Sequence, residues 1–507
     1  MNPPAADIPA GCAPRLKREL GLLDSTMIVV GSMIGSGIFI VSADIARTVG
    51  SAGWLLMVWL ITGAITVIAA LSYGELAGMM PAAGGQYVYL RQAYNPLVGF
   101  LYGWTLFLVI QTGTIAAVAV GFAKFTAVLV PWFSERHVLF SAGSLRISAA
   151  QLLAIASVIV LTGINLRGIR EGKRIQNLFT ITKTAALLGI ILLGIFVGRN
   201  PEVVLANLSS AWSSSWTRLA DGHIASIEPL SGMKLLAAVG VAMVGSLFAS
   251  DAWNNITFTA GEVSQPQRNI PLSLALGTAA VTLLYLLVNI AYMAALPLTG
   301  SPETGDVLGR GIQFAANDRV ATATVMAVFG APAGIFMAIL IMVSTFGCNN
   351  GLILAGARVY YAMARDGVFF RKAAALNRNA VPGAALVLQA VWASLLCLSG
   401  TYGDLLDYVI FAVLIFYILT VAGIFVLRRK EPHAPRPYKA WGYPWLPSLY
   451  ILLASAISVD LLIYKPLFTW PGIGIVLLGI PVYYLWRAVA DPSKDARMPP
   501  SGPVAPA

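Results

Sequence analysis

The sequence has little charge for its length. Only 11% of its 507 residues are Asp, Glu, Lys or Arg, whereas soluble domains carry about 25%. Hydrophobic residues make up 58% of the chain, and its mean hydropathy is +0.78. This composition excludes an ordinary soluble globular domain and is typical of a protein that crosses a lipid bilayer several times.

Residues that build disulfides, metal sites and common catalytic centres are also scarce. The three cysteines have no metal-ligand spacing, and the three histidines all fall in predicted loops. The sequence contains no HExxH, GxSxG or P-loop motif. We therefore expect no disulfide framework, no metal site, no cofactor and no catalytic residue. A membrane-integral enzyme remains only as an alternative outside the predicted class.

Apolar segments recur along the chain at lengths that suit a bilayer, which needs about 20 residues per helix. The stretch 81–96 is too polar to span and predicts an interfacial turn or helix. The Pro-rich residues 1–14 and the tail after Asp491 are predicted to be disordered. The sequence thus predicts an all-α polytopic membrane protein with twelve transmembrane helices, at residues 22–49, 53–79, 97–130, 148–167, 177–198, 233–262, 270–296, 320–357, 382–400, 404–427, 445–464 and 470–487.

The basic residues follow this topology. A net charge of +11 would suit nucleic acid, but the charges form short clusters between apolar segments. With the N-terminus inside, inward segments hold 22 of the 33 Lys and Arg residues and outward segments hold ten, with Lys183 inside a span. This excess predicts cytoplasmic N- and C-termini in a cell inner (plasma) membrane, and no nucleic acid partner.

The first span contains a stretch that does not suit a membrane helix. Residues 31–37 include three glycines and two serines, and each glycine costs a helix about 1 kcal/mol relative to alanine. Two interpretations are open at this point. The small residues form a close helix-packing face, or they mark a broken helix whose free backbone groups face protein or a cavity.

The sixth span has a polar centre at residues 248–255, with Asp251 in its middle. Ser, Asp and Asn compete for backbone hydrogen bonds and favour caps and turns, so this span also predicts a break. Spans one and six are five apart and therefore run in opposite directions, which indicates an inverted 5+5 repeat with substrate between the breaks. Free N–H groups suit a carboxylate and free carbonyls suit an ammonium, so a free amino acid is the expected substrate.

Five segments carry a resemblance to a known family. They are GSMIGSGIF in the first span, SYGELAGMMPAAGGQYVYLRQAY (72–94), FASDAWNNITFTAGEVSQPQRNIPLSL (248–274), ARVYYAMARDGVFF (357–370) and RPYKAWGYPWLP (436–447). In order and spacing they resemble the amino acid–polyamine–organocation (APC) superfamily, and within it a bacterial permease similar to the L-type amino acid transporters (LAT). The resemblance implies a LeuT-type fold in which transmembrane helices 1 and 6 are discontinuous.

This organisation divides the chain into six parts. They are a cytoplasmic N-terminal tail (1–21), a first five-helix repeat (22–198), an extracellular or periplasmic loop (199–232), a second five-helix repeat (233–427), an inner loop with helices 11 and 12 (428–487), and a C-terminal tail (488–507). The loop 131–147 has no cysteine, so the disulfide that animal members form with an accessory heavy chain is not expected there. We expect a single-subunit transporter, with its oligomeric state open.

The resemblance also implies which groups bind the substrate. The site groups are the backbone N–H groups of Gly35, Ser36 and Gly37 for the carboxylate, the carbonyls of Ile34, Phe248 and Ala249 for the amino group, and the side chains of Asp251 and Asn254. Phe248 takes the place of the family's aromatic gate. This chain has Ser250 where the family has an aromatic residue and Ala252 where it has glycine, so side-chain preference is the property these departures affect.

Three intramembrane charges have competing interpretations. Lys183 takes the place of a family lysine that links the broken first helix to the eighth, near Ser344 and Thr345; the alternative is a side chain that snorkels to the inner surface. Asp251 either caps the second half-helix or binds the substrate. Glu75 is expected to pair with Arg91 or with another inner-loop base.

The sequence therefore predicts a secondary active transporter of neutral L-amino acids that works by alternating access, as a sodium-independent exchanger (antiporter) or facilitator. Sodium independence follows from Lys183, because its ammonium would fill the volume that a cation needs. A cationic amino acid transporter and a proton-coupled symporter are alternatives within the class. A membrane amino acid sensor on the same fold is a further alternative.

Overall fold

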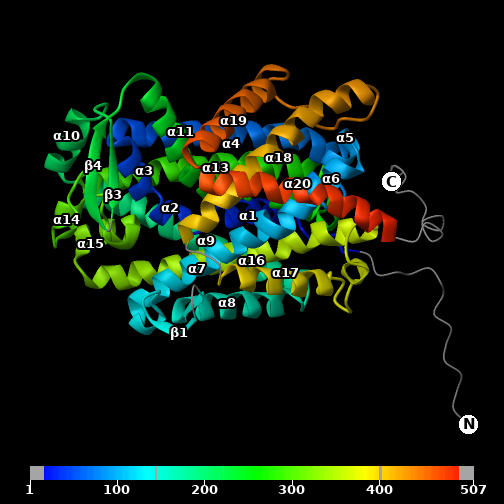
Figure 1. Cartoon of the computed structure of the whole chain (residues 1–507), viewed down its shortest axis with the longest axis horizontal. Coiled ribbons are helices and arrows are strands. Elements are labelled where there is room, and N and C mark those ends of the chain that lie inside the picture. Colours follow the sequence, from blue (N-terminus) through cyan, green and yellow to red (C-terminus); the bar gives the residue numbers. More distant parts are fainter. Residues whose placement is uncertain (1–15, 143–144, 221, 399–401, 490–507) are drawn as a thin grey trace, which may run out of the picture.

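A computed structural model describes residues 16–142, 145–220, 222–398 and 402–489. Long helices run side by side along the longest axis of the molecule and form one elongated bundle (Figure 1). The two segments predicted to be disordered, 1–14 and the tail after Asp491, lie outside the described residues.

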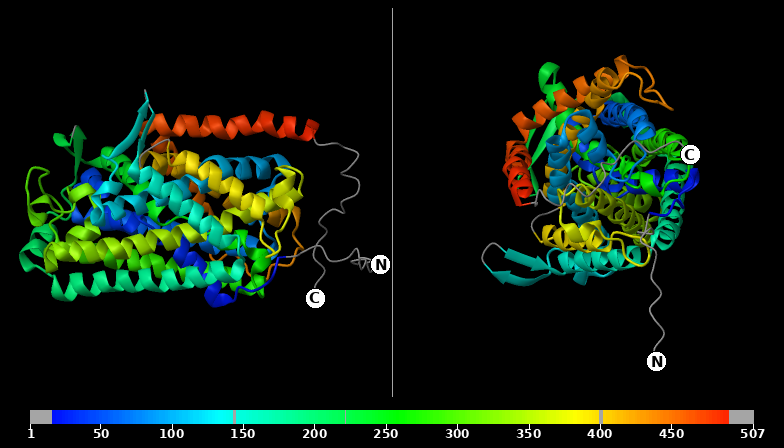
Figure 2. Two further views of the ribbon diagram at one scale, coloured as in Figure 1. Left: turned by 90° about the horizontal axis from the view of Figure 1, so that it is seen from below. Right: turned by 90° about the vertical axis from the view of Figure 1, so that its right-hand side faces the viewer.

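The first half of the chain contains the first five predicted spans. In chain order its helices are α1 (Leu22–Met33), α2 (Gly37–Ile40), α3 (Ser42–Val49), α4 (Ala52–Met79), α5 (Gln86–Ala93), α6 (Pro96–Thr105), a π-helical turn (Leu106–Ile110), α7 (Gln111–Leu129), α8 (Ala149–Asn165), α9 (Ile169–Leu192) and a second π-helical turn (Leu193–Val197). Two hairpins and a short helix lie in the loops: β1 (Val138–Ala142) with β2 (Leu145–Ser148), α10 (Pro201–Ser209), and β3 (Ser215–Ala220) with β4 (His223–Pro229). The β1–β2 hairpin projects sideways from the bundle (Figure 2).

The second half contains the remaining spans. Its helices are α11 (Gly232–Ala249), α12 (Asn255–Phe258), a 3₁₀ turn (Ala260–Glu262), α13 (Pro266–Ala295), α14 (Val307–Arg310), α15 (Val320–Phe329), α16 (Pro332–Arg365), α17 (Gly383–Leu396), α18 (Tyr402–Lys430), α19 (Trp445–Tyr464) and α20 (Pro466–Val489). Across both halves of the described chain, three further 3₁₀ turns lie in loops: Pro131–Phe133 in the first half, and Ala316–Asp318 and Arg371–Ala374 in the second.

Each predicted span contains an apolar helix. In the described part of the chain, ten helical segments are long and apolar enough to cross a membrane. The helices α8 and α17 are apolar but shorter, at 17 and 14 residues. The protein is therefore a mostly helical, multi-pass membrane protein. The total of twelve crossings stays a prediction, because it depends on these two shorter helices.

Two predicted boundaries differ from the structure. The span 320–357 is wrong as a single helix, because Gly330 adopts a left-handed backbone (φ +79°) and Pro332 begins α16. The stretch 81–96 forms α5, which is inserted into the bundle rather than lying only at an interface. There the Gln86 amide donates to the Thr420 hydroxyl at 3.0 Å.

Helices that the predicted repeat relates to one another are neighbours in space. Spans two and seven, α4 and α13, pack together, and so do spans three and eight, α7 and α16. The helix α1 lies in the middle of the bundle among these helices (Figure 1). This arrangement is the one expected for a 5+5 repeat around a central site, and the inverted relation itself stays a prediction.

The predicted cytoplasmic end of the bundle is held by backbone pairing. Leu20, just before α1, forms a parallel bridge with Val263, just after the 3₁₀ turn of span six. The carbonyl of Glu262 accepts the N–H groups of Glu19 at 2.9 Å and Leu20 at 3.0 Å, and the Ser264 N–H donates to the Leu20 carbonyl at 2.9 Å. These bonds tie the start of span one to the end of span six.

The opposite end is held by side chains. One guanidinium nitrogen of Arg47 donates to the Gln313 carbonyl and to the Asp318 carboxylate, each at 2.7 Å. The Gln313 amide donates in return to the Ala46 carbonyl at 3.1 Å. The end of α3 is therefore bound to the loop that precedes α15.

Glu75, on α4, is fully buried and has two arginine partners. Arg428 donates to both carboxylate oxygens, at 2.9 and 2.7 Å, and Arg436 lies 3.3 Å from one of them. The expected ion pair is therefore made by inner-loop bases other than Arg91, which pairs instead with Asp366.

Candidate functional site

The first span is interrupted at its glycine-rich stretch. The helix α1 ends at Met33, Ile34 is extended (φ −74°, ψ 95°), and α2 begins at Gly37. Glycines suit this path because neighbouring helices lie close to the backbone, leaving little room at Gly35 and none at Gly37. A methyl group built at Gly35 would lie 3.1 Å from the Cys348 sulfur, and one at Gly37 would lie 2.7 Å from Ala249 Cβ.

The sixth span is interrupted in its polar centre. The helix α11 ends at Ala249 and α12 begins at Asn255, with non-helical residues between them. Ala252 has a left-handed backbone with φ of 64°, a conformation that glycine adopts far more easily than alanine. The glycine that the family resemblance led us to expect at position 252 therefore has a physical reason, and this chain keeps the conformation without it.

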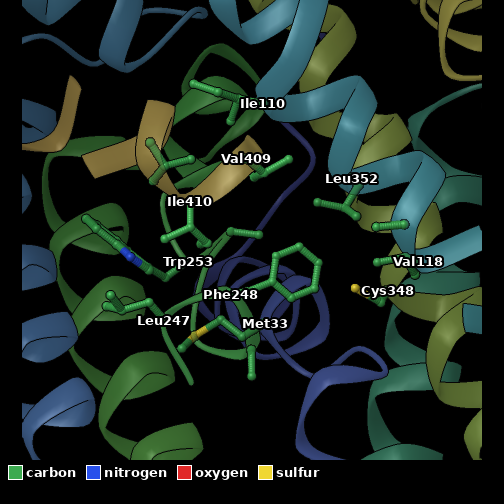
Figure 3. Packing of buried hydrophobic residues seen from close by; sticks show 14 of the residues in the cluster. Met33, Ile110, Val118, Leu247, Phe248, Trp253, Cys348, Leu352, Val409 and Ile410 are labelled. Carbon is green, nitrogen blue, oxygen red and sulfur yellow. The ribbon is translucent and has the colours of Figure 1, made fainter. Parts of the chain in front are cut away.

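The two interruptions touch each other. Gly37 backs directly onto Ala249, since the methyl group built at Gly37 would also lie 2.9 Å from Ala249 Cα. The hydroxyl of Tyr285, on α13, lies 3.1 Å from the Met33 carbonyl and 3.0 Å from the Ala249 carbonyl. One tyrosine therefore joins the last turns of α1 and α11. The ring of Phe248 lies beside this junction, between Met33 and Cys348 (Figure 3).

Lys183 is fully buried and reaches the broken first span. Its ammonium donates to the carbonyl of Ile34 at 2.7 Å and also to the carbonyl of Gly31. The side chain therefore points to the centre of the bundle and does not snorkel. The Ile34 carbonyl, predicted as a substrate ligand, already accepts this bond, although a carbonyl oxygen has two lone pairs.

The eighth span contacts the same stretch from the other side. The Ser344 hydroxyl donates to the Gly35 carbonyl at 3.2 Å, and the Cys348 thiol donates to the Ser32 carbonyl at 3.0 Å. Thr345, predicted beside Ser344, bonds instead to the Ile341 carbonyl of its own helix at 3.0 Å. The carbonyls of the unwound stretch are therefore held from both α9 and α16.

The two polar side chains predicted for span six turn toward α18 and α5. The carboxylate of Asp251 accepts the Tyr417 hydroxyl at 2.6 Å, and the Asn254 amide donates to the Gln86 carbonyl oxygen at 3.0 Å. Both side chains are buried. Asp251 thus contacts another helix, whereas a capping role alone would direct it to the N–H groups of α12.

Two cavities meet at Asp251. The first lies between α7, α12, α16 and α18, and its polar lining comprises Gln86, Gln111, Thr114, Asp251, Asn254 and Asn255. The second lies between α4, α11, α18 and α19, and its lining includes Thr66, Ser250, Asp251, Trp253, Tyr417 and Tyr450. Each cavity is small, with room for about one water molecule, so the unwound part of span six has a narrow space on both of its sides.

Sequence reasoning missed the tyrosines of the site. On α13, Tyr285 contacts both interruptions, Asn289 accepts the Ser42 hydroxyl at 2.7 Å, and the Tyr292 hydroxyl donates to the Ile38 carbonyl at 3.3 Å. Their spacing of four and three residues places them on one face of an otherwise apolar helix, which is a signal present in the sequence. Tyr417 carries no comparable signal, because only packing brings α18 to Asp251.

The comparison with known proteins decides the family. The sequence model described as amino acid permease matches residues 20–483. The chain belongs to this amino acid permease family. Both interrupted spans and the buried Lys183 of this permease lie inside the matched region.

Curated relatives cover almost the whole permease chain. The human large neutral amino acids transporter small subunit 2 is 32% identical over 471 residues, which cover 93% of this chain and 80% of that protein. The human Asc-type amino acid transporter 1 is 28% identical over 480 residues, covering 93% and 83%. The mouse b(0,+)-type amino acid transporter 1 is 26% identical over 475 residues, covering 93% and 88%.

Proposed function

We propose that this permease is a secondary active transporter of neutral L-amino acids that works by alternating access. The observation that carries the proposal is the contact between the two interruptions at Gly37 and Ala249. Backbone N–H groups at the start of α2 suit the substrate carboxylate, and carbonyls at the end of α11 suit its ammonium. The name of one relative, the human large neutral amino acids transporter small subunit 2, supports the same substrate class.

Transport is proposed to be independent of sodium. The Lys183 ammonium donates to two carbonyls of the first interruption, Gly31 and Ile34. A positive charge already held beside these carbonyls would repel a metal cation that approached them. Exchange or facilitated uptake is then the expected mode.

The remaining parts of the proposal concern the cell. We propose that the permease lies in the inner (plasma) membrane with cytoplasmic termini, because the predicted inner segments carry most of the positive charge. It is proposed to act without a disulfide-linked heavy chain, since residues 131–147 contain no cysteine. Transport, and no enzymatic reaction, is its proposed activity.

Counterflow into proteoliposomes tests this function. Vesicles loaded with unlabelled leucine or serine should accumulate the labelled amino acid equally well in sodium and in choline buffers. Empty vesicles provide the control. Strict dependence on sodium would contradict the proposal for Lys183, and absence of counterflow for every neutral amino acid would contradict the proposed substrate class.

One observation favours a second candidate, a transporter of cationic amino acids. Asp251 is buried at the junction of the two cavities, and in the described part of the chain no Lys or Arg pairs with it. A buried carboxylate without a basic partner is a candidate ligand for a substrate's side-chain charge. Competition by arginine that disappears in Asp251→Asn, with leucine counterflow retained, would favour this candidate.

A further inference from the structure

Tyr417, on α18, lies between the two cavities that meet at Asp251. Its side chain lines both of them, together with Asp251 and Val413. Its ring is packed against two others, with centroid distances of 5.8 Å to Tyr73 and 5.3 Å to Trp253. The ring therefore stands as part of the wall between the first cavity and the second.

The hydroxyl of Tyr417 makes a second contribution. It donates to Asp251 at 2.6 Å, which is short for an O–H···O bond and fits a charge-assisted one. In the described part of the chain, this is the only side chain with a hydrogen bond to that carboxylate. A substrate group that approaches Asp251 has to displace the phenol or share the carboxylate with it.

We propose that Tyr417 is a specificity-determining residue of this permease. Its ring closes the second cavity to the substrate side chain and so limits the size that is accepted. Its hydroxyl holds Asp251 and so disfavours a cationic side chain. This inference rests on the proposed transport function, and it adds the second cavity, together with the space that the Tyr417 ring fills, as a latent site for a bulky side chain.

The physical reasons for the two effects are separate. Removing the hydroxyl keeps the ring as a wall but takes away the side-chain partner of the carboxylate, which keeps the bond from the Ala252 backbone, so a guanidinium or ammonium gains a ligand. Loss or gain of a hydrogen bond to a charged group changes affinity by about tenfold or more. Removing the ring joins the two cavities beside Ser250 and Trp253, where an aromatic side chain finds apolar surface.

The experiment compares wild type, Tyr417→Phe and Tyr417→Ala in proteoliposome counterflow of labelled leucine, with arginine and tryptophan as unlabelled competitors. We expect Tyr417→Phe to lower the arginine concentration that halves counterflow by about tenfold. We expect Tyr417→Ala to lower the tryptophan concentration that halves counterflow by about tenfold, because the enlarged site accommodates the indole. In Tyr417→Phe combined with Asp251→Asn, the gain for arginine should disappear.

A matched control is available at Tyr360. This tyrosine is fully buried, lies outside both cavities, and its hydroxyl has no hydrogen-bond partner in the described part of the chain. Tyr360→Phe should keep the wild-type order of competitors. A gain for either competitor in the Tyr417 variants supports the proposal, whereas wild-type competition in both variants overturns it. Loss of counterflow in wild type itself would contradict the transport function and not the role of Tyr417.

Discussion

At the scale of single residues, the site depends on positions where a side chain is absent. Gly37 meets Ala249 at a distance that no side chain can fit, and this contact joins the two interruptions. Glycine allows the two backbones to approach closely here because it has no side chain. Adding even one methyl group at Gly37 should therefore have a large effect on the contact between the two interruptions.

Gly37→Ala should therefore abolish or strongly weaken substrate binding and cost about 1–3 kcal/mol of stability, as overpacking does elsewhere. The expected result is loss of leucine binding in protein that still elutes as a monodisperse peak, measured by scintillation proximity. Gly163→Ala is the control, because nothing lies within 4 Å of a methyl group there, and it should bind as wild type does. Normal affinity of Gly37→Ala would contradict the proposed site.

Lys183 is the residue where binding and movement can be separated. Its ammonium holds two carbonyls of the first interruption from α9, so it links helices and is not itself a proposed ligand. Lys183→Ala should slow counterflow by at least about tenfold while leucine affinity changes much less.

Parallel measurements of leucine affinity and initial counterflow rate, at matched expression, test this separation. A second variant, Lys183→Met, keeps a long apolar side chain and removes the charge, so it distinguishes loss of the ammonium from loss of packing. It should behave as Lys183→Ala does. A wild-type rate in both variants would assign Lys183 a merely structural role.

At the scale of secondary-structure elements, a buried ion pair joins span six to span eight. Arg358, on α16, donates to both carboxylate oxygens of Glu262 at 3.0 Å, and each side chain is only 1% exposed. Such a pair adds little net stability, but removing one partner leaves an uncompensated charge in the interior.

Arg358→Met should therefore destabilise the protein by about 3–5 kcal/mol, seen as a lower midpoint in thermal unfolding monitored by size-exclusion fluorescence. The double variant Arg358→Met with Glu262→Met removes both charges and should recover much of the lost stability. If the double variant is no more stable than Arg358→Met, an uncompensated Glu262 carboxylate is not the cause of the lost stability, and other contacts of Arg358 account for it.

The elements also show which parts of the fold were predictable. Hydropathy located the long apolar helices, and the glycines and serines of 31–37 with the polar run 248–255 indicated both interruptions. These features depend on local composition, which a sequence displays directly. The division of 320–357 is not visible to hydropathy, because apolar residues on both sides of Gly330 and Pro332 make the stretch resemble one long span.

At the scale of the whole molecule, the features that sequence reasoning left open are the exact partners in contacts between distant segments. Glu75 meets Arg428 and Arg436, and Asp251 meets Tyr417. Glu75 and Arg428 are 353 residues apart in the chain, and Asp251 and Tyr417 are 166 apart. Charge or polarity alone does not select one partner among several candidates at such separations. Packing selects it, and packing is what the sequence does not display.

The bundle is bound at both ends around this site. Arg47 holds α3 to the loop before α15, and the bridge between Leu20 and Val263 holds α1 to the end of span six. The glycines of the first interruption are buried between these two closures. Alternating access would require the two closures to open in turn.

The Leu20–Val263 bridge offers a natural reporter of one of these openings. The amides of Glu19, Leu20 and Ser264 all donate within this pairing, so deuterium from the solvent can replace their hydrogens only while the pairing is broken. The deuterium uptake of the peptides that contain them, measured by mass spectrometry, would report how readily this pairing opens without any probe attached to the protein. A substrate that favours the closed form should slow this uptake, and one that drives release toward the cytoplasm should accelerate it.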